Sequence, residues 1–471
     1  MLLATTLTGT VELSDRAVAE LRRALAGPVL LPGDAGYDAA RTVWNRTIDR
    51  RPALVARCAG ADDVVRAIRF AREHDLLLSV RGGGHNVTGS AVCAGGLMLD
   101  LSSMKATRID PAARVAVAEP GLTWGEFDTA TQRSGLATTG GIVSTTGVAG
   151  LTLGGGHGWL MRRHGLTCDN LLAVTLVTAD GRRLRASADE HADLFWGVRG
   201  GGGNLGVVTS FEFRLHPLTH VVAGMLVYPR TLARDVLARY LEVTATAPDD
   251  LAVYAILTTW SDGTPVIAVV PCYSGPPARA AAVVRSLGFP GAPLLDSIRA
   301  MTYGELQSSF DATNPPGPWY YKSGFAEADR VGDGRFGDAL LARCDFPSPS
   351  PLSRIVVEHL GGAAARVPHD ATAFAHRHSA YDLIFIAGGF RPEETSANVQ
   401  WARGAWTAMR PFMSGGVYVN YLDGDEGPSR VEAAYGATYE RLAALKRRYD
   451  PDNVFRLNQN VRPEAAAPTR R

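Results

Sequence analysis

A histidine follows three glycines at residues 82–85, within the segment LLLSVRGGGHNVTGS that spans residues 76–90. Because glycine has no Cβ atom, a run of glycines lets several backbone N–H groups converge on one anion. A neutral imidazole at the tip of such a turn is a nucleophile near neutral pH. The segment predicts a phosphate cradle that carries a reactive histidine, His85. The alternative is a turn histidine that only hydrogen-bonds a phosphate.

Two more glycine clusters predict further walls of the same binding site. They are GIVSTTGVAGLTLGGGHGW at residues 141–159 and GVRGGGGNLGVV at residues 197–208. A mononucleotide needs fewer than three such cradles, so the three clusters together favour a dinucleotide that lies between them.

The third cluster also contains the glycine spacing of a Rossmann fingerprint, Gly201-x-Gly203-x-x-Gly206. That spacing indicates a nicotinamide dinucleotide site only where it follows a strand and opens a helix. Here a predicted helix, HADLFWGVR, precedes the glycines and a predicted strand, LGVVTSFEFRL, follows them. The sequence therefore argues against a Rossmann site.

A carboxylate and two neighbouring polar side chains are candidates for the wall of a substrate cavity. Glu358 interrupts the apolar strand RIVVEHL. It either faces solvent at a sheet edge or points into a cavity as a base with a raised pKa. The segment WYYKSGF adds Tyr321 and Lys322, and lysine is scarce in this chain.

The segment YVNYLD, residues 418–423, offers phenol and amide groups close together. The alternation of a strand would place Tyr418 and Asn420 on one face, with Val419 and Tyr421 on the other. A buried tyrosine with a lowered pKa could accept a proton, and the alternative is an aromatic side chain that only packs between two domains.

Helical and strand patterns alternate around the glycine clusters. Residues 62–74 and 123–135 predict helices, whereas 76–80, 97–101 and 113–119 predict strands and 171–187 a hairpin. From residue 221 to 411 the glycine clusters disappear. Strands at VVAGMLVY, LAVYAILTTW, PVIAVVPCY, RIVVEHL and LIFIAGG there alternate with helices near 231–246, 277–286 and 394–410. A Pro-rich surface loop is expected at 344–353.

Length, charge and cysteine content restrict the class of protein. A chain of 471 residues exceeds one core, so at least two domains are expected. The net charge of +1 gives no argument for nucleic acid or an anionic membrane as a partner. We expect no secretory signal or membrane span, because no long apolar run occurs. The five cysteines lack metal-binding spacing, which predicts no metal site and a cytoplasmic location.

Four blocks of the sequence together resemble the FAD-linked oxidases of the berberine bridge enzyme type, within the vanillyl-alcohol oxidase/PCMH superfamily. The blocks are RGGGHN, GGIVSTTGVAGLTLGGGHGWLMRRHGLTCDNL, LFWGVRGGGGNLGVVTSFEF and YVNYLD…YDPDNVFRLNQN, and the resemblance runs from about residue 40 to 461. It implies an α+β fold with a split PCMH-type FAD-binding domain at residues 1–220 (core about 47–218) and 412–471. A substrate-binding domain at 221–411 would cover the flavin with an antiparallel sheet.

The resemblance also implies how the cofactor is attached. In the family, the histidine at the position of His85 is bonded covalently to the 8α-methyl group of the flavin. Many members add a second bond from a cysteine, but that position here is Val143, and Cys168 lies well beyond it. We therefore expect a single bond through His85.

By the same resemblance, Tyr418 lies near flavin N5 as a proton acceptor or substrate orienter, with Glu358, Asn420 and Tyr321 as further catalytic candidates. His157 either contacts the ring or caps a turn. The predicted FAD envelope comprises the following residues: Arg81, Gly82, Gly83, Gly84, His85, Asn86, Gly89, Ser144, Thr145, Thr146, Gly147, Gly150, Gly154, His157, Asp169, Asn170, Gly203, Asn204, Gly206, Val207, Val208 and Asn458.

The implied function is an FAD-dependent oxidase that removes a hydride from a small molecule and reoxidises with O2 to give H2O2. Sugars, alkaloids and polyketide-type secondary metabolites are the substrate classes that the resemblance suggests. The alternatives are a flavin dehydrogenase with another electron acceptor, a redox-neutral flavin-dependent cyclase or isomerase, and a flavin-holding protein without turnover. No pattern in the sequence predicts an oligomeric state.

Overall fold

The computed structural model describes residues 1–471 except 261, 333, 344–349, 390 and 464–471. Most of the Pro-rich segment at 344–353 therefore lies outside the described residues. The chain begins with a hairpin and short elements that lead into the first glycine cluster: β1 (Leu2–Thr5), β2 (Thr10–Leu13), α1 (Asp15–Ala24) and α2 (Tyr37–Arg41).

Two sheets form the half of the molecule that carries the glycine clusters. One has the order β3-β4-β6-β5, with β3 (Val29–Leu30), β4 (Leu54–Arg57), β5 (Leu78–Arg81) and β6 (Leu97–Asp100). Helix α3 (Ala61–Glu73) connects β4 to β5, and β4, β6 and β5 pair in parallel. The glycines at 82–84 follow β5 directly, as the sequence predicts.

The second sheet of this half is antiparallel, with the order β11-β10-β12-β8-β7. Its strands are β7 (Thr107–Asp110), β8 (Val115–Ala118), β10 (Leu171–Val177), β11 (Arg183–Ser187) and β12 (Val207–Arg214). The last glycine cluster follows helix α7 (Ala192–Val198) and opens strand β12. This order is the reverse of a Rossmann unit, as the sequence predicts.

A nine-stranded antiparallel sheet forms the other half. Its strands are β14 (His220–Ala223), β15 (Leu226–Pro229), β16 (Leu251–Thr259), β17 (Pro265–Tyr273), β18 (Leu295–Asp296), β19 (Arg299–Thr302), β20 (Trp319–Ala326), β21 (Arg354–His359) and β22 (Tyr381–Gly388). The sequence analysis missed β20. It also predicted one strand at 221–228, which the structure divides at Gly224 because a φ of +157° interrupts the strand there.

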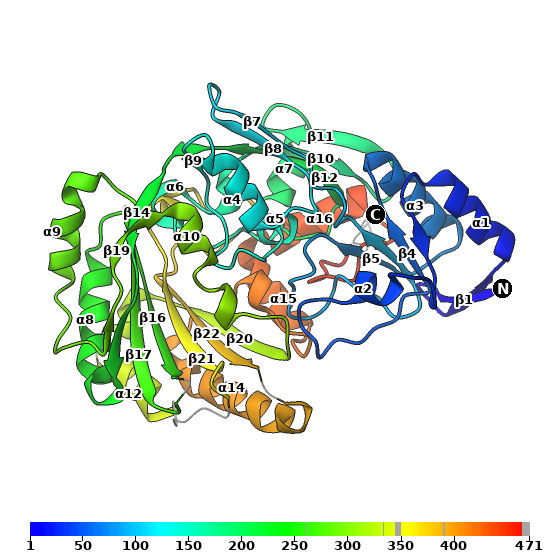
Figure 1. Ribbon diagram of the computed structural model, residues 1–471. Helices are drawn as coiled ribbons and strands as arrows, with labels where there is room; N and C mark the ends of the chain where they lie inside the picture. Colours follow the sequence, from blue (N-terminus) through cyan, green and yellow to red (C-terminus); the bar gives the residue numbers. More distant parts are fainter. Residues whose placement is uncertain (261, 333, 344–349, 390, 464–471) are drawn as a thin grey trace, which may run out of the picture.

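Helices cover one face of the large sheet, and the other face points toward the glycine clusters (Figure 1). The helices are α8 (Ala233–Ala245), α9 (Pro277–Leu287), α12 (Arg335–Arg343) and α14 (Thr395–Met409). Along β16, β21 and β22 the side chains at odd positions, such as Val253, Ile355 and Phe385, belong to the core that includes α8 and α14. Side chains of alternate residues point to opposite faces, so the even positions face the other way.

The C-terminal segment returns to the first half. Helices α15 (Pro428–Tyr435) and α16 (Tyr439–Tyr449) follow, and α16 packs against α7. Figure 1 shows the red α16 among blue and cyan elements. The buried Lys446 ammonium binds the Asp450 carboxylate at 2.6 Å and the backbone carbonyls of Asn204 and Phe455. These contacts join the last residues of the chain to the third glycine cluster.

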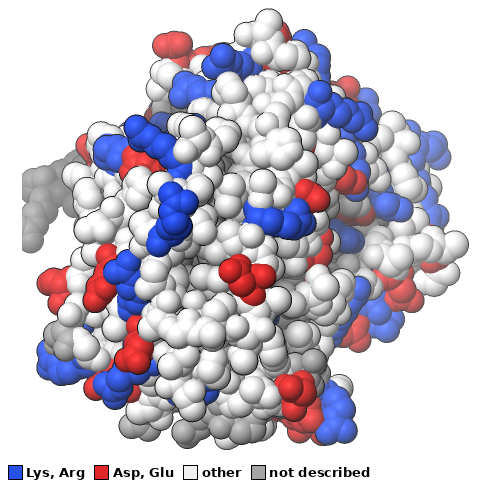
Figure 2. Space-filling view, turned by 60° about the vertical axis from the view of Figure 1, so that its left-hand side comes forward, with Lys and Arg blue, Asp and Glu red and all other residues white. Residues whose placement is uncertain are grey.

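Two observations concern the surface charge and the hydropathy of the helices. On the face shown in Figure 2, basic and acidic side chains are interspersed, without a wide patch of one sign. Across the described part of the chain, no helix combines the length and the apolar character that crossing a membrane requires.

A buried carboxyl group joins the two halves. Asp128, on α4 (Trp124–Gln132), accepts a hydrogen bond from Gln307 Nε2 at 2.9 Å, and Gln307 lies on α10 (Tyr303–Ser308). The other oxygens, Asp128 Oδ1 and Gln307 Oε1, are buried without hydrogen-bond partners. Burial raises the pKa of Asp128 to about 7. A protonated Asp128 supplies a donor that this pair otherwise lacks.

This contact predicts how stability depends on pH. Asp128 keeps its proton in the folded protein up to about pH 7, whereas an unfolded chain loses it above about pH 4. Stability from this group is therefore full below pH 4 and falls by roughly 1.4 kcal/mol per pH unit as pH rises toward 7. In Asp128→Asn a permanent amide donor replaces the acid. We expect urea unfolding of this variant to lose that component of the pH dependence.

The matched control is Asp235→Asn, since Asp235 is exposed on α8. It should follow the wild type at every pH. An unchanged slope between pH 4 and 7 in Asp128→Asn would contradict the assignment of a shared proton at this contact.

Candidate active site

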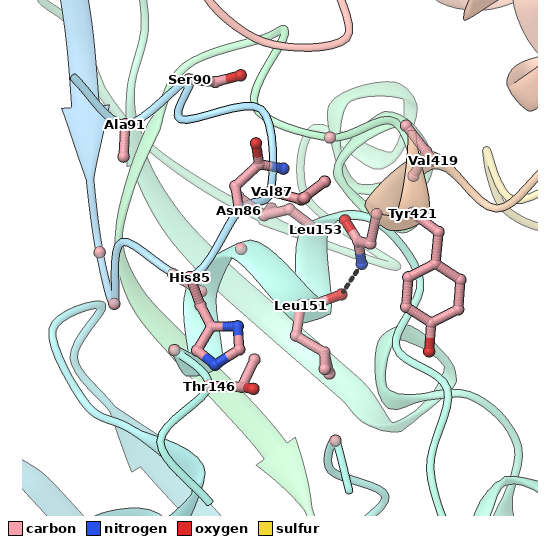
Figure 3. Close-up of a pocket in the computed structure, with 18 of the residues that line it drawn as sticks. His85, Asn86, Val87, Ser90, Ala91, Thr146, Leu151, Leu153, Val419 and Tyr421 are labelled. Carbon is pink, nitrogen blue, oxygen red and sulfur yellow. Dashed lines mark hydrogen bonds between the residues drawn. The ribbon is translucent and has the colours of Figure 1, made fainter. Parts of the chain in front are cut away.

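A cavity of about 340 Å³ lies between the glycine clusters and the large sheet. Figure 3 shows His85 and Thr146 at one side of it, Tyr421 at the other, and Leu151 and Leu153 between them. Eighteen predicted site residues line it: Gly82, Gly83, Gly84, His85, Asn86, Thr146, Gly147, Gly150, His157, Gly203, Gly206, Val207, Val208, Asn458, Tyr321, Glu358, Tyr418 and Asn420. Segments from both halves and from the C-terminal tail therefore meet here.

Two glycine clusters touch each other through their backbones. A Cβ atom on Gly83 would lie 2.5 Å from the Gly147 Cα atom, and one on Gly147 would lie 2.6 Å from the Gly83 nitrogen. Gly84 has a φ of +67°, which residues with a side chain rarely adopt. The wall of the cavity is thus bare backbone, which a phosphate or a flat ring can approach closely.

His85 is half-buried beside the cavity and held by aromatic rings. Its imidazole stacks on Trp44 with centroids 4.2 Å apart, and Trp44 stacks on Trp319 at 4.9 Å. The Nε2 atom lies 3.4 Å from the hydroxyl of Thr145. Burial lowers the pKa of His85 to about 4, so its imidazole is neutral near pH 7. A neutral imidazole held in one place has the protonation state that the predicted nucleophile requires.

The residues of the cavity fit FAD. Asn458 Oδ1 is buried without a hydrogen-bond partner, while its Nδ2 donates to the Gly203 carbonyl at 3.0 Å. An unpaired buried acceptor beside a cavity points to a ligand that brings a donor. Val143, which the sequence analysis predicts at the position of the family's second cysteine, lines the cavity and carries no thiol. Cys168 is buried and does not line the cavity, and burial raises the pKa of its thiol.

Eight residues of the predicted envelope lie behind the wall rather than in it. They are Arg81, Gly89, Ser144, Thr145, Gly154, Asp169, Asn170 and Asn204. Ser144 binds Asp311 of the other half through its N–H at 2.9 Å and its hydroxyl at 2.5 Å. A Cβ atom on Gly154 would meet the Asn420 amide at 2.2 Å. Gly89 turns at a φ of +66°.

The polar members of this group hold neighbouring segments in place. Arg81 donates to the Ala40 carbonyl, and Asp169 accepts two hydrogen bonds from Arg377, at 2.7 and 2.8 Å. Asn170 Nδ2 donates to the carbonyls of His164 and Leu166, as α6 (Met161–His164) ends. Asn204 Oδ1 accepts from Val461 N at 2.9 Å. Most of their polar atoms bond to protein, whereas the Arg81 Nε atom is buried without a hydrogen-bond partner.

The segment YVNYLD forms a 3₁₀ turn at Val419–Tyr421, not the predicted strand. Tyr421 N donates to the Tyr418 carbonyl at 2.9 Å, which closes the turn. As a result Tyr418, Asn420 and Tyr421 all line the cavity, although strand alternation had placed Tyr421 on the opposite face. A segment without a pairing strand is free to turn, and the period-2 prediction fails for that reason.

The Tyr418 hydroxyl oxygen accepts three hydrogen bonds. The donors are the Gly156 N–H at 2.8 Å, the His157 N–H at 3.3 Å and the Asn420 side-chain amide at 2.8 Å. The His157 imidazole also stacks on the Tyr418 ring, with centroids 3.9 Å apart. Burial raises the pKa of Tyr418, although the three donors oppose this. Tyr418 therefore stays a neutral phenol near pH 7, fixed against the glycine wall.

Glu358 lies on β21, in the interior of the large sheet, and is only 1 % exposed. This excludes the alternative of a solvent-facing edge position. Its Oε1 atom accepts a hydrogen bond from the Tyr421 hydroxyl at 3.0 Å, and Oε2 lies 3.2 Å from His157 Nδ1. Its partner on the next strand is Asp382, whose two oxygens are buried without hydrogen bonds.

Burial and the neighbouring Glu358 carboxylate raise the pKa of Asp382 well above its usual range. Two buried carboxyl groups this close cannot both ionise without a large cost, so the pair holds one proton. Of the two, Glu358 is the one that has hydrogen-bond partners. The ligand atoms of His157, Glu358 and Asp382 lie within 4.8 Å of one another, a spacing that a metal ion could also bridge.

Tyr321 lines the cavity, whereas Lys322 points the other way. The Tyr321 ring makes edge contacts with Trp44 and Tyr421, and burial raises its pKa to about 12. The Lys322 ammonium binds Asp425 at 2.7 Å and Glu426 at 2.8 Å. The prediction of Lys322 as a cavity residue is wrong, because β20 alternates and only one of the two neighbours can face the cavity.

Sequence reasoning missed Asp382, Arg354 and Trp44. Asp382 is an acidic residue at the start of the apolar run YDLIFIAGG, the same signal that singled out Glu358. Arg354 begins β21 four residues before Glu358, so strand alternation would have placed both on one face. No pattern in the sequence indicates Trp44.

Comparisons with known proteins identify the family of the chain. A family model for an FAD binding domain matches residues 52–187, and one described as berberine and berberine like matches residues 417–462. An FAD-linked oxidoreductase of Dictyostelium discoideum is 32% identical over 454 residues, covering 96% of this chain and 98% of the relative. The chain belongs to the berberine bridge enzyme-like family of FAD-linked oxidoreductases, and its cofactor is FAD.

Three further similarities concern one sequence relative and two solved structures. (R)-6-hydroxynicotine oxidase of Paenarthrobacter nicotinovorans is 29% identical over 476 residues, or 94% of this chain and 98% of the relative. The crystal structure of 6-hydroxy-D-nicotine oxidase from Arthrobacter nicotinovorans has a TM-score of 0.84 and 29% identity, over 96% of this chain and 100% of that one. Berberine bridge enzyme, at 20% identity and a TM-score of 0.85, shares the fold.

The contact between the two glycine walls predicts the effect of a single methyl group. In Gly147→Ala the new Cβ atom would lie 2.6 Å from the Gly83 nitrogen and push the walls apart. Overpacking of about 1–3 kcal/mol should lower the affinity for FAD roughly tenfold or more. The measurement is the flavin-to-protein absorbance ratio of the purified protein. Gly404→Ala on α14, where a Cβ atom meets nothing within 4 Å, is the control. Full flavin content in Gly147→Ala would contradict the close contact.

Proposed function

We propose that the protein is an oxidase of a small molecule such as a sugar, an alkaloid-like amine or another secondary metabolite. Bound FAD would accept a hydride from the substrate carbon and pass the electrons to O2, which yields H2O2. The observation that carries the proposal is the buried Glu358 carboxylate, which lines the same cavity as His85 and the glycine walls. A negatively charged base beside a cofactor site is what removal of a substrate proton requires.

Glu358 accepts the substrate proton. Tyr421 and His157 orient its two oxygens, and the protonated Asp382 leaves Glu358 as the ionised member of the pair. Tyr418, which stays neutral, positions the substrate and can donate its own proton, since three N–H groups already point at its oxygen. Asn420 fixes Tyr418, and Tyr321 forms part of the wall.

His85 is the attachment point of the cofactor, through a single covalent bond. Its neutral imidazole faces the cavity, and Trp44 fixes the ring plane. Val143 lines the cavity at the position of the family's second cysteine, so no second bond can form. A covalent bond would anchor the flavin and favour its reduction by a poor hydride donor.

The test separates reduction of the flavin from its reoxidation. Substrates are first identified by anaerobic bleaching of the flavin absorbance. With such a substrate, Glu358→Gln should reduce its flavin roughly 10²–10⁴-fold more slowly than the wild type, because the general base is lost. Chemically reduced samples of both proteins, mixed with air, should regain their colour equally fast and release one H2O2 per flavin.

Glu432→Gln, an exposed substitution on α15, is the control and should behave as the wild type. Slow reoxidation without H2O2 would replace the oxidase with a dehydrogenase that uses another acceptor. Turnover without flavin bleaching would favour a redox-neutral cyclase. If the substrate reduces the flavin of Glu358→Gln as fast as that of the wild type, another residue is the base.

A further inference from the structure

The cavity face of the large sheet is arranged in three rows across β16, β21 and β22. The register pairs Glu358 with Tyr254 and Asp382 in the first row, and Val356 with Ile256 and Ile384 in the second. The third row is Arg354, flanked by Thr258 and Ile386. An acidic row and a basic row thus lie at opposite ends of an aliphatic one.

Arg354 is a cation without an anionic partner among the described residues. Its Nη1 atom donates to the carbonyls of Leu352 at 2.9 Å and Thr313 at 3.3 Å, and Nη2 donates to Asn314 Oδ1. A guanidinium has five N–H groups, so at least two remain without an acceptor in the part of the chain that the structure describes. The Trp319 ring lies 5.6 Å from the guanidinium carbon and holds its plane.

The position of Arg354 makes the missing partner a ligand. Arg354 and Asn314 both line the cavity. It is the one Arg or Lys side chain among the described lining residues, which otherwise are mainly apolar, aromatic or glycine. A half-buried guanidinium costs free energy unless an anion compensates it, and its planar fork matches a carboxylate with two parallel hydrogen bonds.

The spacing along β21 sets the size of this ligand. Arg354 and Glu358 are four residues apart, which is about 13 Å between Cα atoms at about 3.3 Å per residue. Both side chains reach into the same space, and Val356 with Ile256 and Ile384 lies between them. A molecule that touches both ends needs an apolar middle of several carbon atoms.

We propose that the substrate is an elongated carboxylate, that Arg354 binds its carboxylate group, and that its apolar body places the reacting carbon near Glu358. The proposal rests on the function proposed above, in that Glu358 marks the reacting end. Among the substrate classes proposed above, it favours a secondary metabolite that carries a carboxylate over sugars and simple amines, and it makes Arg354 a residue that determines specificity.

Calorimetric titration of the FAD-loaded protein tests the proposal without turnover. The probes are 5-phenylpentanoate and its primary amide, which have the same shape and differ in charge at pH 7. The wild type should bind the carboxylate at least roughly tenfold more tightly, the gain expected of charge-assisted hydrogen bonds. Arg354→Gln should bind both probes with equal affinity, and Arg354→Lys should keep part of the preference.

Arg183→Gln, an exposed substitution on β11, controls for the change in net charge and should keep the full preference. Flavin content and melting temperature show whether each variant is folded. If Arg354→Gln does not fold, the proposal is still tested by the affinities of the wild type and of Arg354→Lys for the two probes. Equal binding of both probes by the wild type, or a preference that survives in Arg354→Gln, would overturn the proposal. The titration needs neither flavin reduction nor O2. The carboxylate proposal can therefore be contradicted while the oxidase proposal stands, and the oxidase proposal can be contradicted while the carboxylate proposal stands.

Discussion

The register of β21 between β16 and β22 determines which side chains reach the cavity. Side chains alternate between the two faces of a strand, so a shift of one residue would turn Glu358 toward α8 and α14. Apolar side chains at odd positions, among them Val357 and Leu383, resist that shift because they fill the core beneath the helices. Packing of these apolar side chains therefore holds the carboxyl groups of Glu358 and Asp382 at the cavity. Burial of the two carboxyl groups costs free energy, and the packing offsets that cost.

The opposite wall depends on contacts that cross between the halves. Ser144 is held by Asp311, Trp44 Nε1 donates to the Asn314 carbonyl at 3.1 Å, and the Asn45 amide bonds to the Trp319 backbone. These links place the glycine turns against the sheet. Among the predicted cofactor residues that do not line the cavity, Ser144 makes one of these links, and Asp169 makes another with Arg377. Bare glycines and His85 line the cavity itself.

Much of the fold could be predicted from the sequence, because its strongest signals are local. The strands at 76–80 and 97–101, the hairpin at 171–187 and the helix at 62–74 follow from apolar periodicity and turn residues. The turn at Val419–Tyr421 could not be predicted, because a segment rich in aromatic residues resembles a strand until its partners are known. The pairing of strands that lie far apart in the sequence could not be predicted either. Glu358 was identified as an exception to its strand, but its hydrogen bonds to Tyr421 and its neighbour Asp382 depend on residues far away in the sequence.

The proposed oxidase chemistry requires that FAD occupies this cavity, and the proposed attachment of FAD is a covalent bond to His85. The mass of the intact protein after denaturation in acid measures this directly. We predict the mass of the chain plus one FAD, with the flavin located on the peptide that contains His85, and the mass of the bare chain for His85→Ala. A wild-type mass without flavin, together with a yellow supernatant, would contradict the covalent bond. Flavin found on a peptide that contains Cys168 would contradict the assignment of His85.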